Sequence, residues 1–319
     1  MPPSIRPYSD NDRRALLELW AAALPLDAIT VDTLETRVLL DENFDPDTFL
    51  TAWEDDTLVG FVLGVYPKRM PLGDADPGGD RCWITALGVD PGASLEKVGG
   101  NLLTVVERKF RSLGKHDCRV SSYPPGYFTP GIDKKAYRHL LDLFLTRGYE
   151  VFHEALSMDS PIVLFTIPET TREIEARLRA ENIEVRSYRR TDLIQLMDFL
   201  EKTMPSDWVR VERQNLRNIP GGGFHAEQIM LVTRGDEIVG YCQFEGSHFG
   251  PFGVSSQYQG RGIGTVLLAR TLERMRQEGY HNAWVMWTDD LAAKVYKKFG
   301  FNETRRFALL QKHLNREML

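Results

Sequence analysis

The chain has 319 residues, of which 42% are hydrophobic and 26% charged, with a formal net charge of -6. This length corresponds to about two domains, and the composition is that of a globular protein with a sizeable core, not of a disordered or fibrous chain. Because an acidic chain lacks the basic field that attracts nucleic acid or anionic lipid, we expect no nucleic acid and no membrane among its main partners.

No basic start followed by an apolar segment occurs in the N-terminal sequence MPPSIRPYSDNDRR, and no apolar run approaches the roughly 18 residues of a membrane span. The three cysteines, Cys82, Cys118 and Cys242, are far apart and lack metal-ligand spacing. We therefore expect a cytoplasmic protein with no metal site.

The sequence contains two copies of one pattern. Residues 5–8, Ile-Arg-Pro-Tyr, recur as Val-Arg-Ser-Tyr at 185–188, and Leu-Val-Gly-Phe at 58–61 recurs as Ile-Val-Gly-Tyr at 238–241. Both matches have an offset of 180 residues. Two independent matches at one offset indicate an internal repeat.

Weaker matches have shorter offsets of 165 and 152 residues: 87–90 with 252–255, and 147–149 with 299–301. The first copy therefore carries extra residues, which we place in the Pro- and Gly-rich stretches 67–81 and 121–138.

The repeat divides the chain into an N-terminal domain over 1–158, a linker helix over 159–182 and a C-terminal domain over 183–319. The linker helix is predicted from the polar sequence ETTREIEARLRAEN.

In the second copy we expect a strand at 183–187, a helix that Asp192 caps, strands at 228–234, 237–245 and 250–255, a helix at 262–278, a strand at 283–288 and a helix at 290–299. The two residues Gly235-Asp236 predict a hairpin turn between two of these strands. Hairpins combined with strand-turn-helix units predict an α/β fold with a mixed sheet.

The segment from Gln259 to Thr265, QGRGIGT, lies between a predicted strand and an amphipathic helix. Backbone N–H groups at a helix N-terminus have no intrahelical partner and carry a partial positive field, which suits a pyrophosphate. Gly262 and Gly264 would let a phosphate approach the main chain, and Arg261 adds a charged donor. The alternative is a tight turn that merely requires glycine.

Two motifs in this copy resemble those of the GNAT superfamily of N-acetyltransferases. Gln259-x-x-Gly262-x-Gly264 resembles the acyl-CoA motif Q/R-x-x-G-x-G/A of that superfamily. The segment from Asp289 to Phe301 resembles its ending N-x-x-A-x-x-x-Y-x-x-x-G-F, with Asp289 where the family usually has Asn.

Residues 183–310 thus resemble one GNAT domain, and the repeat extends the likeness to 4–157. The whole resembles a tandem GNAT protein, a layout found in mycothiol synthase and in a bacterial glucosaminide acetyltransferase. The resemblance implies two tandem GNAT-like acyl-CoA N-acyltransferase domains and acetyl-CoA as co-substrate. It also implies the following cofactor-binding residues: Phe252, Val254, Gln259, Gly260, Arg261, Gly262, Ile263, Gly264, Thr265 and Asp289.

The same resemblance suggests how the acetyl group is transferred. A protonated amine cannot attack a thioester, so a base must take its proton, while an acid in reach helps the thiolate to leave. Tyr296 occupies the acid position, and Glu245 or His248, near the end of one strand and the start of the next, would supply the base. The structural alternatives are a packing aromatic for Tyr296, a surface carboxylate for Glu245 and a strand cap for His248.

The first copy lacks several of these groups. Aligning the copies places Phe144 opposite Tyr296, and Ser94, Lys97 and Gly99 opposite Gln259, Gly262 and Gly264. We therefore expect the first copy to have a structural or substrate-shaping role and the second to hold the active site.

The sequence predicts an acetyl-CoA-dependent N-acetyltransferase that acts on the primary amine of a small molecule, with amino sugars first because the tandem layout resembles enzymes of that kind. A non-catalytic acyl-CoA-sensing module and a protein or peptide N-acetyltransferase are the alternatives. The presence of Tyr296 favours the enzyme over the sensor.

Overall fold

The structure, a computed structural model, describes residues 3–314 and consists of two compact units. Unit 1 comprises Met1–Ala155 with Arg305–Leu319, and unit 2 comprises Leu156–Thr304. These units differ from the predicted segments because residues 307–308 and 310–313, expected in the C-terminal domain, pair with two strands of unit 1.

The elements of unit 1 are, in chain order, β1 (Ser4–Pro7), α1 (Arg13–Ala23), α2 (Val31–Leu34), β2 (Phe49–Glu54), β3 (Thr57–Val65), β4 (Arg81–Val89), α3 (Leu95–Ser112), β5 (Asp117–Val120), β6 (Ile132–Asp133) and α4 (Arg138–Thr146). Two long strands, β7 (Glu150–Pro161) and β13 (Asn302–His313), extend from one unit into the other. The sheet order in unit 1 is β1-β2-β3-β4-β5-β13, and β6 also pairs with β13.

Unit 2 contains α5 (Glu169–Ala180), β8 (Ile183–Ser187), α6 (Leu193–Thr203), α7 (Ser206–Asn218), β9 (Ile229–Arg234), β10 (Glu237–Glu245), β11 (His248–Val254), α8 (Ile263–Gln277), β12 (Asn282–Thr288) and α9 (Asp290–Lys297). Its sheet order is β7-β12-β11-β10-β9-β8. The predicted elements of this copy are present with bounds shifted by at most two residues, whereas α7 and the length of β7 and β13 were not predicted.

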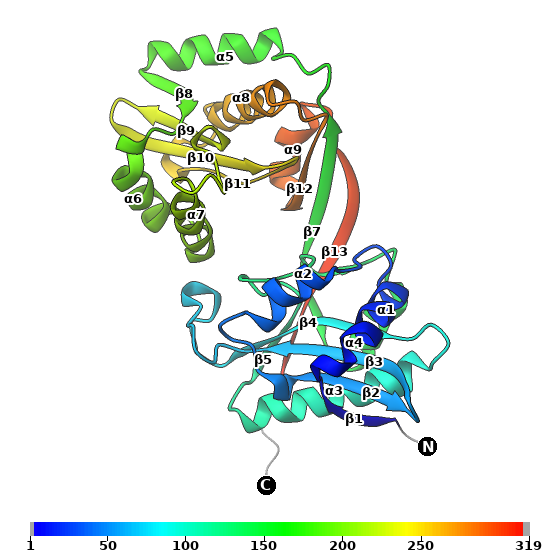
Figure 1. Ribbon diagram of the computed structural model, residues 1–319. Coiled ribbons are helices and arrows are strands. Elements are labelled where there is room, and N and C mark those ends of the chain that lie inside the picture. Colours follow the sequence, from blue (N-terminus) through cyan, green and yellow to red (C-terminus); the bar gives the residue numbers. More distant parts are fainter. Residues whose placement is uncertain (1–2, 315–319) are drawn as a thin grey trace. The chain divides into compact units, whose positions relative to one another are not determined.

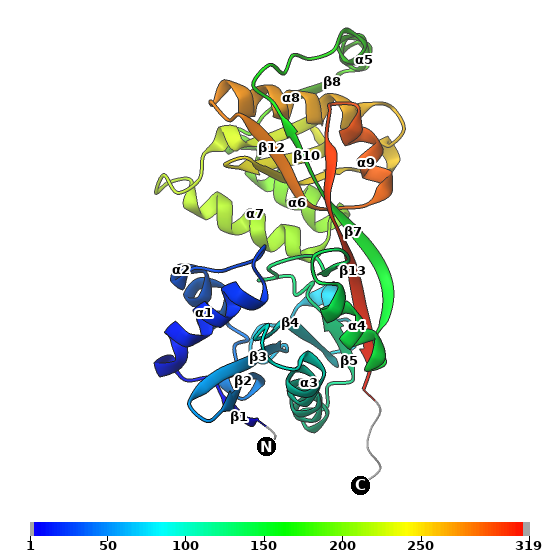
Figure 2. The same ribbon diagram turned by 90° about the vertical axis from the view of Figure 1, so that its right-hand side faces the viewer.

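Helices cover both faces of each sheet, as Figures 1 and 2 show. In unit 2, α8 and α9 bury one face of the sheet, and α6 and α7 bury the other. In unit 1, α3 and α4 pack on one face and α1 on the other. Mixed sheets between helical layers confirm the predicted α/β class. None of the helices within residues 3–314 is long and apolar enough to span a membrane.

The internal repeat is visible in an ion pair that both units contain. Arg6 donates two hydrogen bonds to Asp12, of 2.7 and 2.8 Å, and Arg186 donates two to Asp192, of 2.6 and 2.8 Å. Asp192 was expected to cap α6, but its side chain makes no cap bond to that helix and instead accepts the backbone N–H of Arg189, at 2.7 Å. The carboxylate is occupied by the arginine and the preceding turn.

Strand register shows the same repeat. Gly60 pairs with Val89 in unit 1, and Gly240 pairs with Val254 in unit 2. These pairs are related by the offsets of 180 and 165 residues found in the sequence. The first group of extra residues, predicted at 67–81, therefore lies between β3 and β4.

One parallel strand pair in each unit separates after a short stretch of pairing. In unit 2, β11 and β12 pair only at His248 and Trp284, and the equivalent pair in unit 1 is Trp83 with Arg119, 165 residues earlier in each strand. Beyond this point the two strands diverge, which leaves main-chain groups on their inner edges without a strand partner. This gap is where each unit can accommodate a ligand.

Candidate active site

The QGRGIGT segment forms a glycine turn that leads into α8. Gly260 and Gly262 have φ angles of 78° and 87°, in the left-handed region that favours glycine. The N–H of Val266 donates to the carbonyl of Gly262 at 3.2 Å. The N–H groups of the first three helical residues, Ile263, Gly264 and Thr265, have no carbonyl partner within the helix. The start of α8 therefore presents a cluster of N–H donors with the positive end of the helix dipole.

The strand beside the turn directs main-chain groups into the gap. The N–H of Ser255 donates to the carbonyl of Val239 on β10, at 2.9 Å, so by alternation the N–H and C=O groups of Phe252 and Val254 point away from β10, toward β12. The side chain of Gln259 donates to the Val254 carbonyl at 3.2 Å. Phe252 and Val254 thus occupy the position expected of strand residues that pair with a ligand.

Helix α5, the predicted linker, packs on the glycine turn. A Cβ on Gly262 would lie 2.7 Å from Cγ2 of Ile174, and Arg177 donates to the carbonyl of Arg261 at 2.9 Å. The guanidinium of Arg261, predicted to contact phosphate, is ion-paired with Glu181. Sequence reasoning missed these contacts, because nothing in the polar α5 sequence indicates which turn it covers.

Tyr296 lies in the core on the α8 side of the sheet, with 4% of its surface exposed. Its ring makes edge contacts with Phe249 and Phe252, at centroid distances of 5.4 and 5.9 Å. Burial raises the pKa of its hydroxyl, against the opposing effect of a hydrogen bond with Thr288. Tyr296 is therefore protonated at neutral pH, as a proton donor must be.

Asp289 caps helix α9. Its carboxylate accepts the N–H of Ala292 at 2.7 Å. Aspartate and asparagine are both good N-caps, so the difference from the family pattern leaves the helix start intact.

Glu245 and His248 face each other across the hairpin between β10 and β11. Glu245 is exposed, and the ring of His248 lies 4.5 Å from the ring of Trp284, at the closed end of the gap. Thr288, which contacts the Tyr296 hydroxyl, is four residues further along β12, roughly 13 Å at the rise of a strand. The structure thus brings the two base candidates together and places them away from the hydroxyl of Tyr296.

A second polar group of unit 2 was missed by sequence analysis. Glu212 of α7 is fully buried against β10 and contacts the hydroxyl of Tyr241. That hydroxyl also lies 2.9 Å from Oε1 of Gln243, which accepts from Asn215 at 2.9 Å. No sequence motif indicates this cluster, since Glu212 looks like one more charged residue of a polar helix.

Tyr241 has one proton, which it can donate to Oε2 of Glu212 or to Oε1 of Gln243, and the latter oxygen also accepts from the Asn215 amide. Oε1 of Glu212 is buried without a hydrogen-bond partner within the described part of the chain. Desolvation raises the pKa of Glu212 to about 7, against the lowering effect of the Tyr241 hydrogen bond.

The first copy lacks the glycine turn altogether. Helix α3 begins at Leu95, so the residues that align with the turn form its first helical turn, capped by Ser94, which accepts the N–H of Lys97 at 3.4 Å. The side chain of Arg147 lies so close to Gly100 that a Cβ there would be 1.9 Å from Nη2. The α3 terminus is therefore closed to the contacts that the α8 terminus offers. Within residues 3–314 no three His, Cys, Asp or Glu side chains are grouped as metal ligands would be.

The buried acid makes stability depend on pH. Because the folded state holds the Glu212 proton up to about pH 7, while the ordinary pKa is 4.5, the folded state binds more protons between these values and its stability falls as pH rises through them. Glu212→Gln keeps an oxygen that accepts from Tyr241 but cannot titrate, so we expect it to remove a pH-dependent loss of about 3 kcal/mol in the free energy of unfolding. Urea unfolding at about pH 5 and pH 8 measures this loss.

Glu184→Gln, at an exposed position of β8, is the matched control and should leave the pH dependence of the wild type unchanged. An equal pH dependence in wild type and Glu212→Gln would show that Glu212 is ionised in the folded protein.

Comparison with known proteins agrees with this geometry. The sequence profile of the acetyltransferase (GNAT) family matches residues 14–121 and 193–301, more than half of the chain. No curated protein sequence matches the chain. Three solved structures share the fold at low sequence identity.

The first is a fungal multi-domain β-N-acetylglucosaminidase with a GCN5-related glucosamine N-acetyltransferase region, at 18% identity and a TM-score of 0.77. The match covers 97% of this chain but 38% of that one, so this chain spans well under half its length. The second is a GCN5-related N-acetyltransferase from Sphaerobacter thermophilus, at 16% identity and a TM-score of 0.70, and the match covers 98% of this chain and 96% of that one. The third is a tandem GNAT protein from the clavulanic acid biosynthesis pathway, at 11% identity and a TM-score of 0.62, covering 99% of both chains.

Identities this low show a shared fold and leave the substrate open. The family profile matches one segment in each copy, and the matches to the second and third structures extend over nearly the whole chain. The chain belongs to the GNAT family of acetyltransferases and is a tandem GNAT N-acetyltransferase.

Proposed function

We propose that unit 2 transfers the acetyl group of acetyl-CoA to the primary amine of a small molecule. The observation that carries the proposal is the glycine turn at α8, whose free amides stand next to the outward-facing main chain of Phe252 and Val254. A pyrophosphate fits such a helix terminus, and an extended amide-bearing arm fits the open strand edge. Unit 1, which lacks the turn, has a structural or substrate-shaping role.

The cofactor-binding set keeps the residues proposed from the sequence. Gln259, Gly260, Gly262, Ile263, Gly264 and Thr265 would hold the phosphates through the turn. Arg261 joins them by exchanging its ion pair with Glu181 for a phosphate, since guanidinium binds both in the same bidentate way. Asp289 acts through the α9 cap, which fixes the helix that carries Tyr296.

The reaction joins the amine nitrogen to the acetyl carbon and breaks the carbon–sulfur bond. Acetyl-CoA supplies the activated acetyl thioester. The proton on the attacking amine goes to a base, for which His248 and Glu245 at the closed end of the gap are the candidates. Because these residues lie away from the Tyr296 hydroxyl, water molecules would carry the proton to them. The departing sulfur takes the proton of Tyr296, which burial keeps in place at neutral pH.

Amino sugars are the first acceptor class to test, supported by the tandem layout and by the glucosamine N-acetyltransferase region named in the fungal neighbour. Thiol release from acetyl-CoA is measured over a panel of amino sugars, aminoglycosides, polyamines, amino acids and peptides. Release with a small amine supports the proposal. Release with peptides alone would move the acceptor to proteins, and no release with any amine would contradict it.

The cofactor site is tested by placing a carboxylate in the turn. A side chain on Gly264 meets its nearest neighbour, Cζ of Phe252, at an ordinary 3.4 Å, so Gly264→Glu should fold while its charge repels a pyrophosphate. We expect one acetyl-CoA site per chain by calorimetry, absent in this variant. Lys97→Glu, in the exposed first turn of α3, is the control and should bind as the wild type does.

Gly99, the residue aligned with Gly264, is a poor control because a Cβ there would lie 2.9 Å from Leu143 and disturb the core of unit 1. Two comparable acetyl-CoA sites in the wild type would contradict the assignment of a single site to unit 2.

The acid is tested by Tyr296→Phe, which keeps the ring contacts and removes the hydroxyl. We expect acetyl-CoA binding to persist and turnover to fall by roughly 10²–10⁴-fold, with the high-pH limb of the rate profile flattened or displaced. Phe144→Tyr, the reverse exchange in unit 1, should create no activity. Undiminished turnover in Tyr296→Phe would show that another group protonates the thiolate.

A further inference from the structure

Unit 1 contains a cavity in the gap between its own diverging strands. The pairing of β4 with β5 ends at Ile84 and Val120, and the cavity opens directly beyond these residues. Phe144, which takes the position of Tyr296, forms part of its wall. The cavity therefore lies where the reaction centre of unit 2 lies, in a copy that has lost the phosphate turn.

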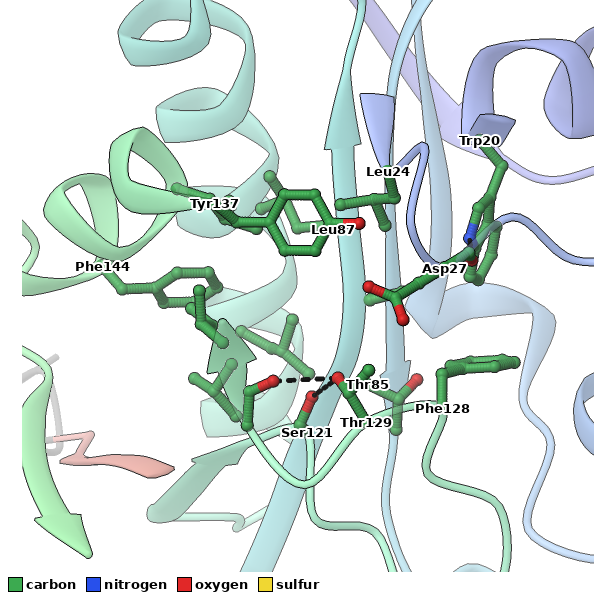
Figure 3. A pocket seen from close by; sticks show the side chains of 16 residues that line it. Trp20, Leu24, Asp27, Thr85, Leu87, Ser121, Phe128, Thr129, Tyr137 and Phe144 are labelled. Atoms are coloured by element: carbon green, nitrogen blue, oxygen red, sulfur yellow. Dashed lines mark hydrogen bonds between the residues drawn. The ribbon is translucent and has the colours of Figure 1, made fainter. Parts of the chain in front are cut away.

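The space is small and its walls are largely apolar. About 40 Å³ is open to the centre of a water-sized sphere, which corresponds to about three water molecules. Trp20 and Phe128 stand at one side, and Tyr137 and Phe144 at the other (Figure 3). A compact end group fits this space, whereas a nucleotide does not.

The charged residue of the wall is already paired. Asp27 accepts two hydrogen bonds from Arg305, of 2.7 and 2.8 Å, and Arg305 also donates to Asp133 at 2.7 Å. Because the Arg305 guanidinium is shared by two carboxylates, this group of side chains has no net positive charge with which to bind an anion. An ammonium ion would have Asp27, already bonded to Arg305 and to the Tyr137 hydroxyl, as its charged partner in largely apolar walls, which offsets little of its desolvation.

The Ser121 hydroxyl of the wall can still donate. The Thr129 hydroxyl donates to the carbonyl of Gly131 at 2.8 Å, and the Ser121 and Thr129 hydroxyl oxygens lie 3.5 Å apart, too far for a strong bond. Figure 3 shows these hydroxyls and the Asp27 carboxylate pointing toward the same space. A carboxylate has about four acceptor sites, and Asp27 accepts two bonds from Arg305 and one from the Tyr137 hydroxyl, so it can also accept an N–H.

We propose that this cavity binds a neutral carboxamide end group of acetamido size. The Ser121 hydroxyl donates to its carbonyl, Asp27 accepts its N–H, and its methyl group packs against Ile84 and Leu87. A neutral group that has one donor, one acceptor and one apolar end satisfies this wall without burying an unpaired charge. The proposal concerns unit 1 alone and is independent of the acceptor that unit 2 uses.

The test uses the full-length chain and fluorine NMR of N-methyltrifluoroacetamide. We expect protein-dependent line broadening that acetamide competes away, while acetate and ethylammonium, close in size but charged, compete at least tenfold less well. Ser121→Ala removes the hydroxyl that donates to the ligand carbonyl, so binding should weaken about five- to tenfold.

Two variants fill the cavity from opposite walls. Ala86→Leu on β4 and Leu140→Phe on α4 should each abolish the broadening, and thermal melting identifies any variant that has not folded. Gly264→Glu in unit 2 should leave the broadening intact, which separates this site from the acetyl-CoA site. Broadening that survives both filled variants, disappears with Gly264→Glu, or is competed equally by acetate would overturn the proposal.

Discussion

Two parallel strands that separate after a short stretch of pairing impose the constraint on which both units depend. Every main-chain N–H and C=O on the inner edges of such a gap must find a partner. In unit 2 the free edge of β11 remains available beside the amides of the α8 turn. In unit 1 the chain itself supplies a partner, since the N–H of Ser121 donates to the carbonyl of Ile84 at 2.8 Å and the following loop covers the gap. One copy thus keeps an opening for a ligand, and the other has mostly closed it.

The difference between the copies begins at the start of one helix. Helix α3 starts about one turn before the position that corresponds to Ile263 in α8. The residues of unit 1 that align with the glycine turn are therefore helical. Arg147 then occupies the space above Gly100. A few residues decide this: Ser94 favours an earlier cap, and Lys97 replaces a glycine that unit 2 holds at a positive φ. The loss of the phosphate turn thus has a local cause in the backbone.

Local patterns predicted much of the fold and part of the site. The repeat, the mixed sheet and the glycine turn each depend on residues close in sequence, and Tyr296 was found by its motif spacing. The pairing of residues 310–313 with β5 was not predicted, because no local pattern tells a strand which distant edge it joins. The same reason hid the contact of Ile174 with the turn and the buried position of Glu212, which lies on a helix with mostly polar residues. Long-range packing decides these features, and the sequence of α7 by itself is that of an exposed helix.

The pairing of β13 with β5 affects the order in which the protein can fold during its synthesis. Most of unit 1 is synthesised before unit 2, yet its sheet is completed by residues 307–313, which are made after unit 2. Leu310, buried against Val120, is therefore missing from the nascent unit 1 while unit 2 is made. The edge of β5 stays open during this time, and an open edge is a site for wrong strand pairing. The half of the chain that lacks the acetyl-CoA turn is in this way the half that is completed only after the other half has been synthesised.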